Sequence, residues 1–498
     1  RLDNAWLWLA IAMVAIPGVI IAMAPPISTD ELYYHLALPE LMERHGGWVG
    51  GVLHPDGSRP LAFHLPLTMV LATGGVGAVK VVQVGLSVAL LVGVAEVAEA
   101  HWDKAVGSMA VLLMAGSWSF AHEAGVVTNN VLAAIGCLAA LDAALRGNWR
   151  VLSVAAGMAL AVKYTSAGPL LGVFLVASLS WRQRISSGLA AVGLLSPWWI
   201  RNAVEGLHPL FPYVGWPGDL TFQYLERYGA GRSAMDFLML PWNAIMTAEV
   251  DSYRFMGQLH PLFLGLIPIA ILIGWRDLKV RSLVIVTVIG CVFWALGPHW
   301  FRYLLPTLPV LALSAGVGAS WLLARPKGGV MAFGALGLVG LMGLPANLGP
   351  MLLDTAKAWP VASGQVSDSV FLKEHVHDWP VIEWSNEHLP SDAKVALLFS
   401  WSGYLLERDR VLGSVEDHVP TRHWVTSHGE MSLSALRAQG VSHLVVGRAA
   451  FLPKSYPFLT EKQLSVEFWQ PRDQLESLLL MEATLLFQHR HSRVFRLN

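Results

Sequence analysis

Long apolar runs follow one another from residue 5 to residue 346, with little of the apolar–polar alternation that marks a β-strand. A helix that crosses a bilayer needs about 20 predominantly apolar residues, so successive runs of this kind are typical of membrane helices. Only 14% of the residues are charged, whereas a soluble domain carries about 25%. The net charge of −1 gives no reason to expect a nucleic-acid partner. We therefore predict a polytopic α-helical membrane protein embedded in a lipid bilayer.

The apolar runs divide best into about eleven transmembrane helices of unequal length. The predicted spans are 5–24, 77–98, 105–121, 130–146, 151–163, 166–180, 185–200, 260–274, 282–297, 303–323 and 329–346. The fifth and the sixth are shorter than a standard crossing, and we expect them to form short helices around a cavity. Irregular backbone at membrane depth is tolerated only where protein or water surrounds it.

Basic residues mark every second loop between the predicted spans, and short loops rich in Lys and Arg stay in the cytoplasm. They are Lys104, Arg146, Arg150, Arg182, Arg184, Arg276, Lys279, Arg281, Arg325 and Lys327. This orientation places the N-terminus in the cytoplasm and three large segments on the extracytoplasmic side. These are a first loop at 26–76, a middle loop at 201–259 and the tail at 347–498. Residues 1–346 then form the transmembrane domain.

The tail at 347–498 differs in composition from the rest of the chain and predicts a small extracytoplasmic α/β domain. Its predicted elements are a strand at 394–399, a helix at 432–439 that ends at Gly440, and strands at 441–446, 485–488 and 494–497. The chain has two cysteines, Cys137 and Cys291, and both fall inside apolar runs. They favour packing over a disulfide, so we do not expect the tail to be held together by cystines.

An acidic pair, Asp30 and Glu31, follows directly after the first apolar run and opens a stretch that continues with Tyr33, Tyr34 and His35. A carboxylate at the membrane surface can accept the proton of an acceptor hydroxyl as that hydroxyl attacks the anomeric carbon of a sugar. Asp is also a favoured N-cap residue, so Asp30 could simply begin the helix that follows. Spacing alone leaves catalysis and capping open.

Several further motifs occur in order along the chain. They are Trp198-Trp199-Ile200-Arg201-Asn202, His208-Pro209-Leu210-Phe211-Pro212, Phe301-Arg302-Tyr303-Leu304-Leu305-Pro306, and Val376–Pro390 ahead of the strand at 394–399. Together with Asp30-Glu31, this order resembles that of the C-type glycosyltransferases. More narrowly, it resembles the superfamily of protein O-mannosyltransferases and lipid A aminoarabinose transferases. The resemblance implies the GT-C fold.

This resemblance also implies a glycosyltransferase of the cell envelope, in the bacterial inner (plasma) membrane. Its donor would be a polyprenyl-phosphate sugar, and its reaction would invert the anomeric centre. Asp30 would be the general base, and Glu31 would orient the acceptor or support a metal ion. The acceptor would be a protein, a lipid or a glycan. The sequence names neither the acceptor nor the sugar, because such pockets are built by shape rather than by readable motifs.

Cations should face the leaving phosphate, because its negative charge grows in the transition state. The candidates for donor-phosphate binding are Lys163, Arg302 and Arg201, with His64 at a position where related proteins often carry a basic residue. Each of the first three has a plain structural alternative. Lys163 could snorkel to the interface, and Arg302 could anchor a helix end. Arg201 could be a basic residue of the ordinary kind that flanks Trp residues at the membrane boundary.

A second group of residues is expected to line the site on the acceptor side. It comprises Tyr33, Tyr34, His35, His122, Glu123, Asn129 and Tyr303. Related proteins often carry an acidic residue where this chain has Asn129, and one carboxylate fewer makes a hard divalent cation less favoured. The sequence therefore leaves open whether a divalent metal ion serves as a cofactor.

Two other kinds of protein remain compatible with the sequence. A transporter or flippase of lipid-linked substrates tends to show paired inverted repeats, whereas this chain concentrates acidic and aromatic residues in one outer loop. A non-catalytic assembly subunit would keep the fold and lose the site. Asn129 leaves room for that alternative, and the intact Asp30-Glu31 pair argues against it.

Overall fold

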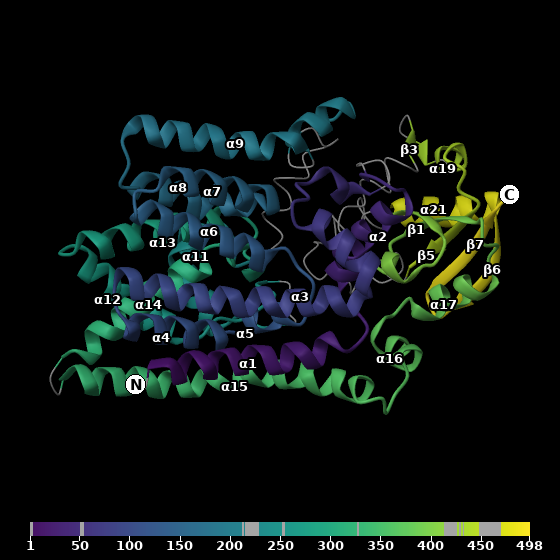
Figure 1. The fold of residues 1–498 in the computed structure, drawn as a ribbon. Helices are drawn as coiled ribbons and strands as arrows, with labels where there is room; N and C mark the ends of the chain where they lie inside the picture. The colour runs from purple at the N-terminus through teal and green to yellow at the C-terminus, as the bar shows by residue number, and fades with distance from the viewer. Residues whose placement is uncertain are drawn as a thin grey trace.

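The computed structural model describes residues 3–49, 54–211, 214, 229–250, 254–325, 328–412, 426–427, 430–431, 433–447 and 470–498. Within these residues a bundle of helices leads into a smaller unit of helices and strands. Figure 1 shows the bundle on the left and the sheet at its right-hand end, with the first-loop helix α2 (Ala37–Arg44) between the two.

Each predicted span overlaps a helix of this bundle. The helices are α1 (Asp3–Ala22), α3 (His64–His101), α4 (Lys104–Ala115), α5 (Trp118–Ala121), α6 (Asn130–Leu145), α7 (Trp149–Val162), α8 (Ala167–Val176), α9 (Trp181–Val204), α11 (Ala234–Met246), α12 (Leu262–Gly274), α13 (Leu278–Leu296), α14 (Leu308–Leu323) and α15 (Gly328–Ala362). The last helix continues past residue 346, where its predicted span ends, and reaches Ala362. The predicted boundary between 346 and 347 therefore falls inside a helix.

Among the described residues, four helical segments are long and apolar enough to cross a membrane by themselves. They are Ala5–Ala22, His64–His101, Leu278–Leu296 and Gly329–Ala362. Together, α4 and the segment Trp118–Ala124 form one further candidate span with a bend of 79°. The two spans predicted to be short correspond to short apolar helices, Trp149–Val162 and Tyr164–Val176. Inside the long α3, Gly75 has a φ of 68°, which glycine adopts without the strain that a Cβ atom would cause.

Small residues allow the helices of the bundle to pack closely. Gly168 and Gly172 lie one turn apart on α8, which packs against α13. A Cβ atom on Gly172 would come within 2.7 Å of the Val286 Cα, and one on Gly168 within 2.6 Å of the Phe293 Cβ. Membrane helices associate largely through van der Waals packing at such small-residue surfaces. The close approach of α8 and α13 therefore depends on these two glycines.

A buried lysine holds the end of α1, the helix that leads to Asp30. Lys80 of α3 is 2% exposed, and its ammonium donates to the carbonyls of Ile21 and Ala24 at 3.2 Å and 2.9 Å. The last carbonyls of a helix have no partner within the helix itself. Lys80 binds one carbonyl in the last turn of α1 and one just past its end, and thereby fixes the point at which the first loop begins.

The smaller unit contains a five-stranded sheet with the order β2-β1-β5-β7-β6. The strands are β1 (Lys394–Leu398), β2 (Asp409–Leu412), β5 (His443–Val446), β6 (Ala483–His489) and β7 (Ser492–Leu497), with a small separate pair of β3 (Thr426–Ser427) and β4 (Glu430–Met431). β1 is parallel to β2 and β5, and β7 is antiparallel to β5 and β6. The predicted strands at 394–399, 441–446, 485–488 and 494–497 are confirmed, whereas β2 was not predicted.

In the part of this unit that the structure describes, four helices accompany the sheet: α16 (Asp368–His375), α17 (Trp379–His388), α19 (Ser434–Ala438) and α21 (Gln470–Glu482). The helix predicted at 432–439 corresponds to α19, and residue 432 lies outside the described part of the chain. Successive side chains of a strand point to opposite faces of the sheet. Ala396 and Leu398 of β1 accordingly pack in a core with α19 and α21.

The opposite face of the sheet packs against the first loop. Val395 and Leu397 of β1 lie in a buried cluster that contains residues of α17 and also Leu38 and Leu41 of α2. A helix from residues 37–44 therefore completes the apolar core of a sheet that begins more than three hundred residues later in the sequence. This arrangement brings the acidic pair of the first loop to the junction between the bundle and the sheet.

We predict that Gly172→Ala destabilises the protein, because the added Cβ would meet the Val286 Cα at 2.7 Å. Overpacking of this kind costs about 1–3 kcal/mol, which should lower the midpoint of thermal unfolding in detergent. Gly188 on α9 has nothing within 4 Å of an added Cβ and provides the matched control. Equal midpoints for Gly172→Ala and Gly188→Ala would contradict the role given to the contact between α8 and α13.

Candidate active site

Asp30 stands at the start of a π-helical turn, η1 (Glu31–His35), in which the Leu36 N–H donates to the Glu31 carbonyl. Single π-helical turns are rare and occur frequently at functional sites. The Asp30 side chain makes no capping hydrogen bond, so the N-cap explanation is wrong. Its carboxylate instead forms an ion pair with Nη1 of Arg302. The Asp30 carboxylate therefore pairs with a cation and does not cap the helix that follows.

Arg302 lies in a short turn, η5 (Phe301–Tyr303), just before α14. Its guanidinium carbon lies 4.4 Å from the centre of the Trp300 ring and 5.3 Å from that of Tyr303. The Arg302 and Asp30 side chains are each 19% exposed, so the ion pair is largely buried but still accessible to solvent. A planar guanidinium held against aromatic faces is suited to binding a phosphate or a carboxylate through two parallel hydrogen bonds.

Lys163 supplies a second cation at the end of α7. Its ammonium donates to the Asn130 side-chain oxygen and lies 5.0 Å from the centre of the Tyr303 ring. The Tyr303 ring is therefore in contact with both Lys163 and Arg302, which confirms that the structure gathers these three predicted residues. The hydrogen bond to a protein amide favours a place in this cluster over the snorkelling alternative for Lys163.

Asn130 links Lys163 to a buried carboxylate. Its amide nitrogen donates to both oxygens of Glu123 at 3.0 Å, and the Thr128 hydroxyl also donates to Glu123. Asn129, the residue that the sequence singled out, turns the other way and donates to the Val162 carbonyl at 3.1 Å. Glu123 thus joins the site as predicted, while Asn130 rather than its neighbour faces the lysine.

Glu31 is almost fully buried and points away from the two cations. Its carboxylate accepts a hydrogen bond from the Val127 N–H at 2.8 Å. This bond joins the first loop to the segment that contains Glu123 and Asn130. Glu31 consequently acts as a tie between two loops, and it is not in contact with Arg302 or Lys163 among the contacts that the described residues make.

Aromatic and imidazole rings stack beside the acidic pair. His35 Nδ1 and His64 Nε2 lie 3.0 Å apart, so one ring donates to the other, and the ring of Tyr34 lies 3.8 Å from that of His35. The carbonyl of Tyr33 accepts from His54 at 2.8 Å. These contacts place the predicted residues Tyr33, Tyr34, His35 and His64 around the π-helical turn.

The local environment keeps two of these rings neutral. Burial lowers the pKa of the His35 imidazole well below its ordinary value, and the neighbouring His64 and Lys163 lower it further. Burial, followed by the Asp30 carboxylate, raises the pKa of the Tyr34 hydroxyl well above its ordinary value. At neutral pH both groups are therefore uncharged.

Two predicted residues lie elsewhere. Arg201 sits 4.8 Å from the centre of the Trp48 ring and donates to the Asn202 side-chain oxygen at 2.8 Å. His122 stacks on Trp118 and lies 3.2 Å from a carboxylate oxygen of Asp354 on α15. The structure therefore does not group either residue with Asp30, Arg302 and Lys163.

Asn202, next to Arg201, accounts for part of the Trp198–Asn202 motif. Its side-chain amide donates to the carbonyls of Ser58 and Pro209 and thereby ties the first loop to α9.

Sequence reasoning overlooked two residues of the site, Asn130 and Arg59. Arg59 forms an ion pair with Asp56 at 2.6 Å, and its charge contributes to the lowered pKa of His35. It follows a short turn, η2 (Pro55–Ser58), and precedes α3. A basic residue near the end of the first loop was expected at His64, and Arg59 lies five positions before it.

The donor set does not fit a divalent metal ion. The carboxylates of Asp30, Glu31 and Glu123 are engaged by Arg302, the Val127 N–H, and Thr128 with Asn130. Among the residues that the structure describes, no group of three or more His, Cys, Asp and Glu side chains could hold a metal ion. Hard divalent cations need several free oxygen ligands. The positive charge at this site comes from Lys163 and Arg302, with Arg59 close enough to act on Lys163.

The chain has the fold that integral-membrane glycosyltransferases of the C type share. It is similar to ArnT from Cupriavidus metallidurans bound to undecaprenyl phosphate, with a TM-score of 0.59 and 14% identity over 99% of this chain and 98% of that chain. It is also similar to the archaeal oligosaccharyltransferase AglB from Archaeoglobus fulgidus in complex with an inhibitory peptide and a dolichol-phosphate. There the TM-score is 0.53, with 10% identity over 100% of this chain and 75% of that chain.

An Archaeoglobus fulgidus oligosaccharyltransferase in complex with Zn and sulfate also matches, with a TM-score of 0.56 and 11% identity over 100% of this chain and 73% of that chain. No protein-family model and no curated protein sequence matches the chain. The predicted resemblance to aminoarabinose transferases is thus confirmed at the level of the fold, which these similarities cover from end to end.

We predict that a chelator leaves the purified protein unchanged. Because the three carboxylates already have protein partners, treatment with EDTA should alter neither the midpoint of thermal unfolding nor the elution of the protein from a sizing column. Elemental analysis should find no stoichiometric divalent metal. A bound metal that EDTA removes with a loss of thermal stability, regained on adding the ion back, would show that the donor set has been misjudged.

Proposed function

We propose that this chain is a membrane glycosyltransferase that moves a sugar from a polyprenyl-phosphate-linked donor to an acceptor hydroxyl on the extracytoplasmic side, with inversion. The observation that carries the proposal is the meeting of Asp30 with Arg302 beside Lys163, where several helices end. Two proteins of the same fold were solved with undecaprenyl phosphate and with a dolichol-phosphate. The same class of lipid phosphate suits the two cations found here.

The reaction is a single displacement at the anomeric carbon. The acceptor oxygen forms a bond to that carbon while Asp30 takes the hydroxyl proton as general base. The bond between the sugar and the phosphate breaks, and the lipid phosphate leaves with the electron pair. Lys163 and Arg302 offset the charge that grows on the phosphate, as fixed cations do in a site shielded from water. Attack from the side opposite the leaving group inverts the centre.

The ion pair between Asp30 and Arg302 suggests how donor binding prepares the base. A guanidinium can bind only a limited number of oxygens in its plane. When the donor phosphate arrives, Arg302 would turn part of its hydrogen bonding from the Asp30 carboxylate to the phosphate. The carboxylate is then available to the acceptor hydroxyl only in the presence of donor.

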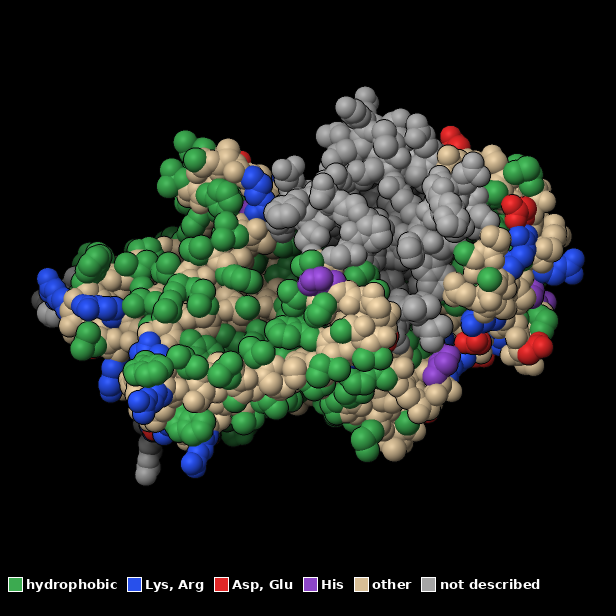
Figure 2. Space-filling model, turned by 90° about the horizontal axis from the view of Figure 1, so that it is seen from above, with side chains coloured by type: hydrophobic (Ala, Val, Ile, Leu, Met, Phe, Trp, Pro, Cys, Tyr) green, Lys and Arg blue, Asp and Glu red, His purple; other side chains and the backbone are tan. Residues whose placement is uncertain are grey.

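The orientation in the membrane is part of the proposal. Figure 2 shows Lys and Arg side chains gathered at the end of the bundle farthest from the sheet, as expected if that end is cytoplasmic. In this orientation about eleven spans cross a bacterial inner membrane. The N-terminus lies in the cytoplasm, and both the α/β unit and the site lie outside. The acceptor would arrive from that side as a protein, a lipid or a glycan.

We predict that Asp30→Asn nearly abolishes transfer, by about 10²–10⁴-fold, as the loss of a general base should. The measurement is transfer of radiolabelled sugar from a panel of polyprenyl-phosphate donors by the full chain in nanodiscs. Glu43→Gln, an exposed carboxylate of the same loop, is the matched control and should be unaffected. Turnover by Asp30→Asn at the level of the parent would rule out this residue as the base. Failure of the parent chain with every donor would favour a transporter or a non-catalytic subunit.

We predict that Arg302→Gln weakens binding of undecaprenyl phosphate about 10–100-fold, because a hydrogen bond to a charged group contributes about 1.5–3 kcal/mol. Binding can be followed with a fluorescent undecaprenyl phosphate in nanodiscs. Arg325→Gln removes a guanidinium that lies 4.0 Å from the Trp321 ring at the opposite end of α14 and should bind like the parent. Equal affinity of Arg302→Gln and Arg325→Gln would remove Arg302 from the phosphate site.

A further inference from the structure

The smaller unit covers the turn that carries Asp30. Its short turn η6 (Gly403–Leu405) packs against η1. Leu32 of η1 is 2% exposed and lies in one buried cluster with Leu372 and Val376 of the smaller unit. The outward side of the π-helical turn is therefore in contact with the smaller unit rather than with water.

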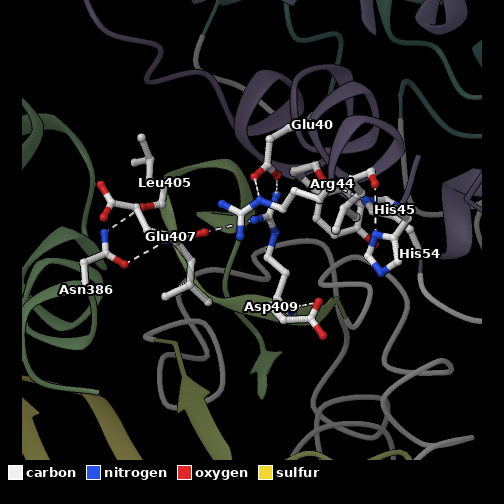
Figure 3. Close-up of polar contacts among 12 residues, drawn as sticks. Glu40, Arg44, His45, His54, Asn386, Leu405, Glu407 and Asp409 are labelled. Carbon is white, nitrogen blue, oxygen red and sulfur yellow. Dashed lines mark hydrogen bonds and ion pairs between the residues drawn. The ribbon is translucent and has the colours of Figure 1, made fainter. Parts of the chain in front are cut away.

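A buried ion pair joins the same two parts. Arg410 lies on β2, at the edge of the sheet, and is 0% exposed. Its Nη2 pairs with Glu40 of α2, and its Nη1 donates to the Leu406 carbonyl at 2.9 Å. Figure 3 shows Glu40 reaching from α2 toward the strand that begins at Asp409. Arg44, one turn further along α2, pairs with the same carboxylate.

This pair constrains α2 strongly. A buried guanidinium without its carboxylate is far less stable than the intact pair, so each partner holds the other in place. In addition, α2 follows η1 without a break, since the Glu40 N–H donates to the Leu36 carbonyl and the Leu36 N–H to the Glu31 carbonyl. The position of α2 on the sheet therefore sets the direction in which η1 points.

We infer that Arg410 and Glu40 are positioning residues for sugar transfer, which hold the turn that presents Asp30 to Arg302. The inference rests on the proposed function. It makes the sheet a structural part of the active site, in addition to any role in choosing the acceptor. The chemistry of the bundle then depends on a contact outside the group formed by Asp30, Arg302 and Lys163.

The experiment compares four forms of the full chain in nanodiscs. Arg410→Met leaves Glu40 with Arg44 alone, and Glu40→Leu with Arg410→Met replaces the pair by two apolar side chains. Arg437→Met is the control, because it breaks a pair with Glu482 at 2.7 Å inside the smaller unit and does not touch the first loop. The readouts are kcat and the donor KM, and amide hydrogen exchange over residues 31–36.

We expect Arg410→Met to lower kcat about tenfold to a hundredfold, because a small misplacement of a catalytic group has effects of that size, with a donor KM within about twofold of the parent. Amides of residues 31–36 should exchange faster in this variant and at the parental rate in Arg437→Met. The double variant should regain most of the lost kcat, because an apolar pair of similar volume can replace a buried ion pair.

Equal kcat and equal exchange in Arg410→Met and Arg437→Met would overturn the inference, as would a double variant no better than the single one. If Arg410→Met does not yield folded protein, Glu40→Gln, which keeps the shape of the side chain, takes its place in the same comparison. If the parent chain transfers no sugar, the proposed function fails. The exchange measurement still decides whether Arg410 holds the turn.

Discussion

Each charge that the bundle encloses needs a partner, because burial in surroundings of low dielectric strongly penalises an ion left alone. This constraint assembles the site. Asp30 meets Arg302, which follows 272 positions later, and Lys163 meets Asn130, which in turn meets Glu123. The partners lie on the first loop, in the turn that contains Glu123, at the start of α6, at the end of α7 and in the turn before α14. Pairing of charges thus brings together segments that the apolar runs alone would leave independent.

Residue type and position predicted several members of the site, and local geometry decided the rest. Lys163 was found because an ionisable residue at the end of a membrane helix is costly, Asp30 because it belongs to an acidic pair directly after the first apolar run, and Arg302 because a leaving phosphate needs a cation. The choice between Asn129 and Asn130 could not be made in that way. Both amides are adjacent, and the start of α6 determines which of them faces the lysine. Arg201 was misplaced for a similar reason, since its stacking on Trp48 comes from a distant loop.

The same distinction holds for the fold. Apolar runs predicted the helices, because the length of such a run and its need for burial are local properties. Most strands were predicted from short apolar stretches, but β2 was missed because it begins with the polar pair Asp409-Arg410. The charged partner of the buried Arg410 is Glu40, which precedes it by 370 positions. The packing of α2 on the sheet depends on the same long-range contact, and no local pattern contains it.

The π-helical turn at Glu31–His35 makes the number of residues as important as their identity. An α-helix advances by about 100° per residue, and the π-helical turn holds one residue more than an α-helical turn would. Deletion of a single residue here would restore ordinary winding and rotate Asp30 away from Arg302, with the hydropathy of the segment almost unchanged. Surface loops usually absorb such changes of length. In this loop a one-residue insertion or deletion would change which side chain faces the Arg302 guanidinium. A change in the length of the loop would therefore change the chemistry of the site.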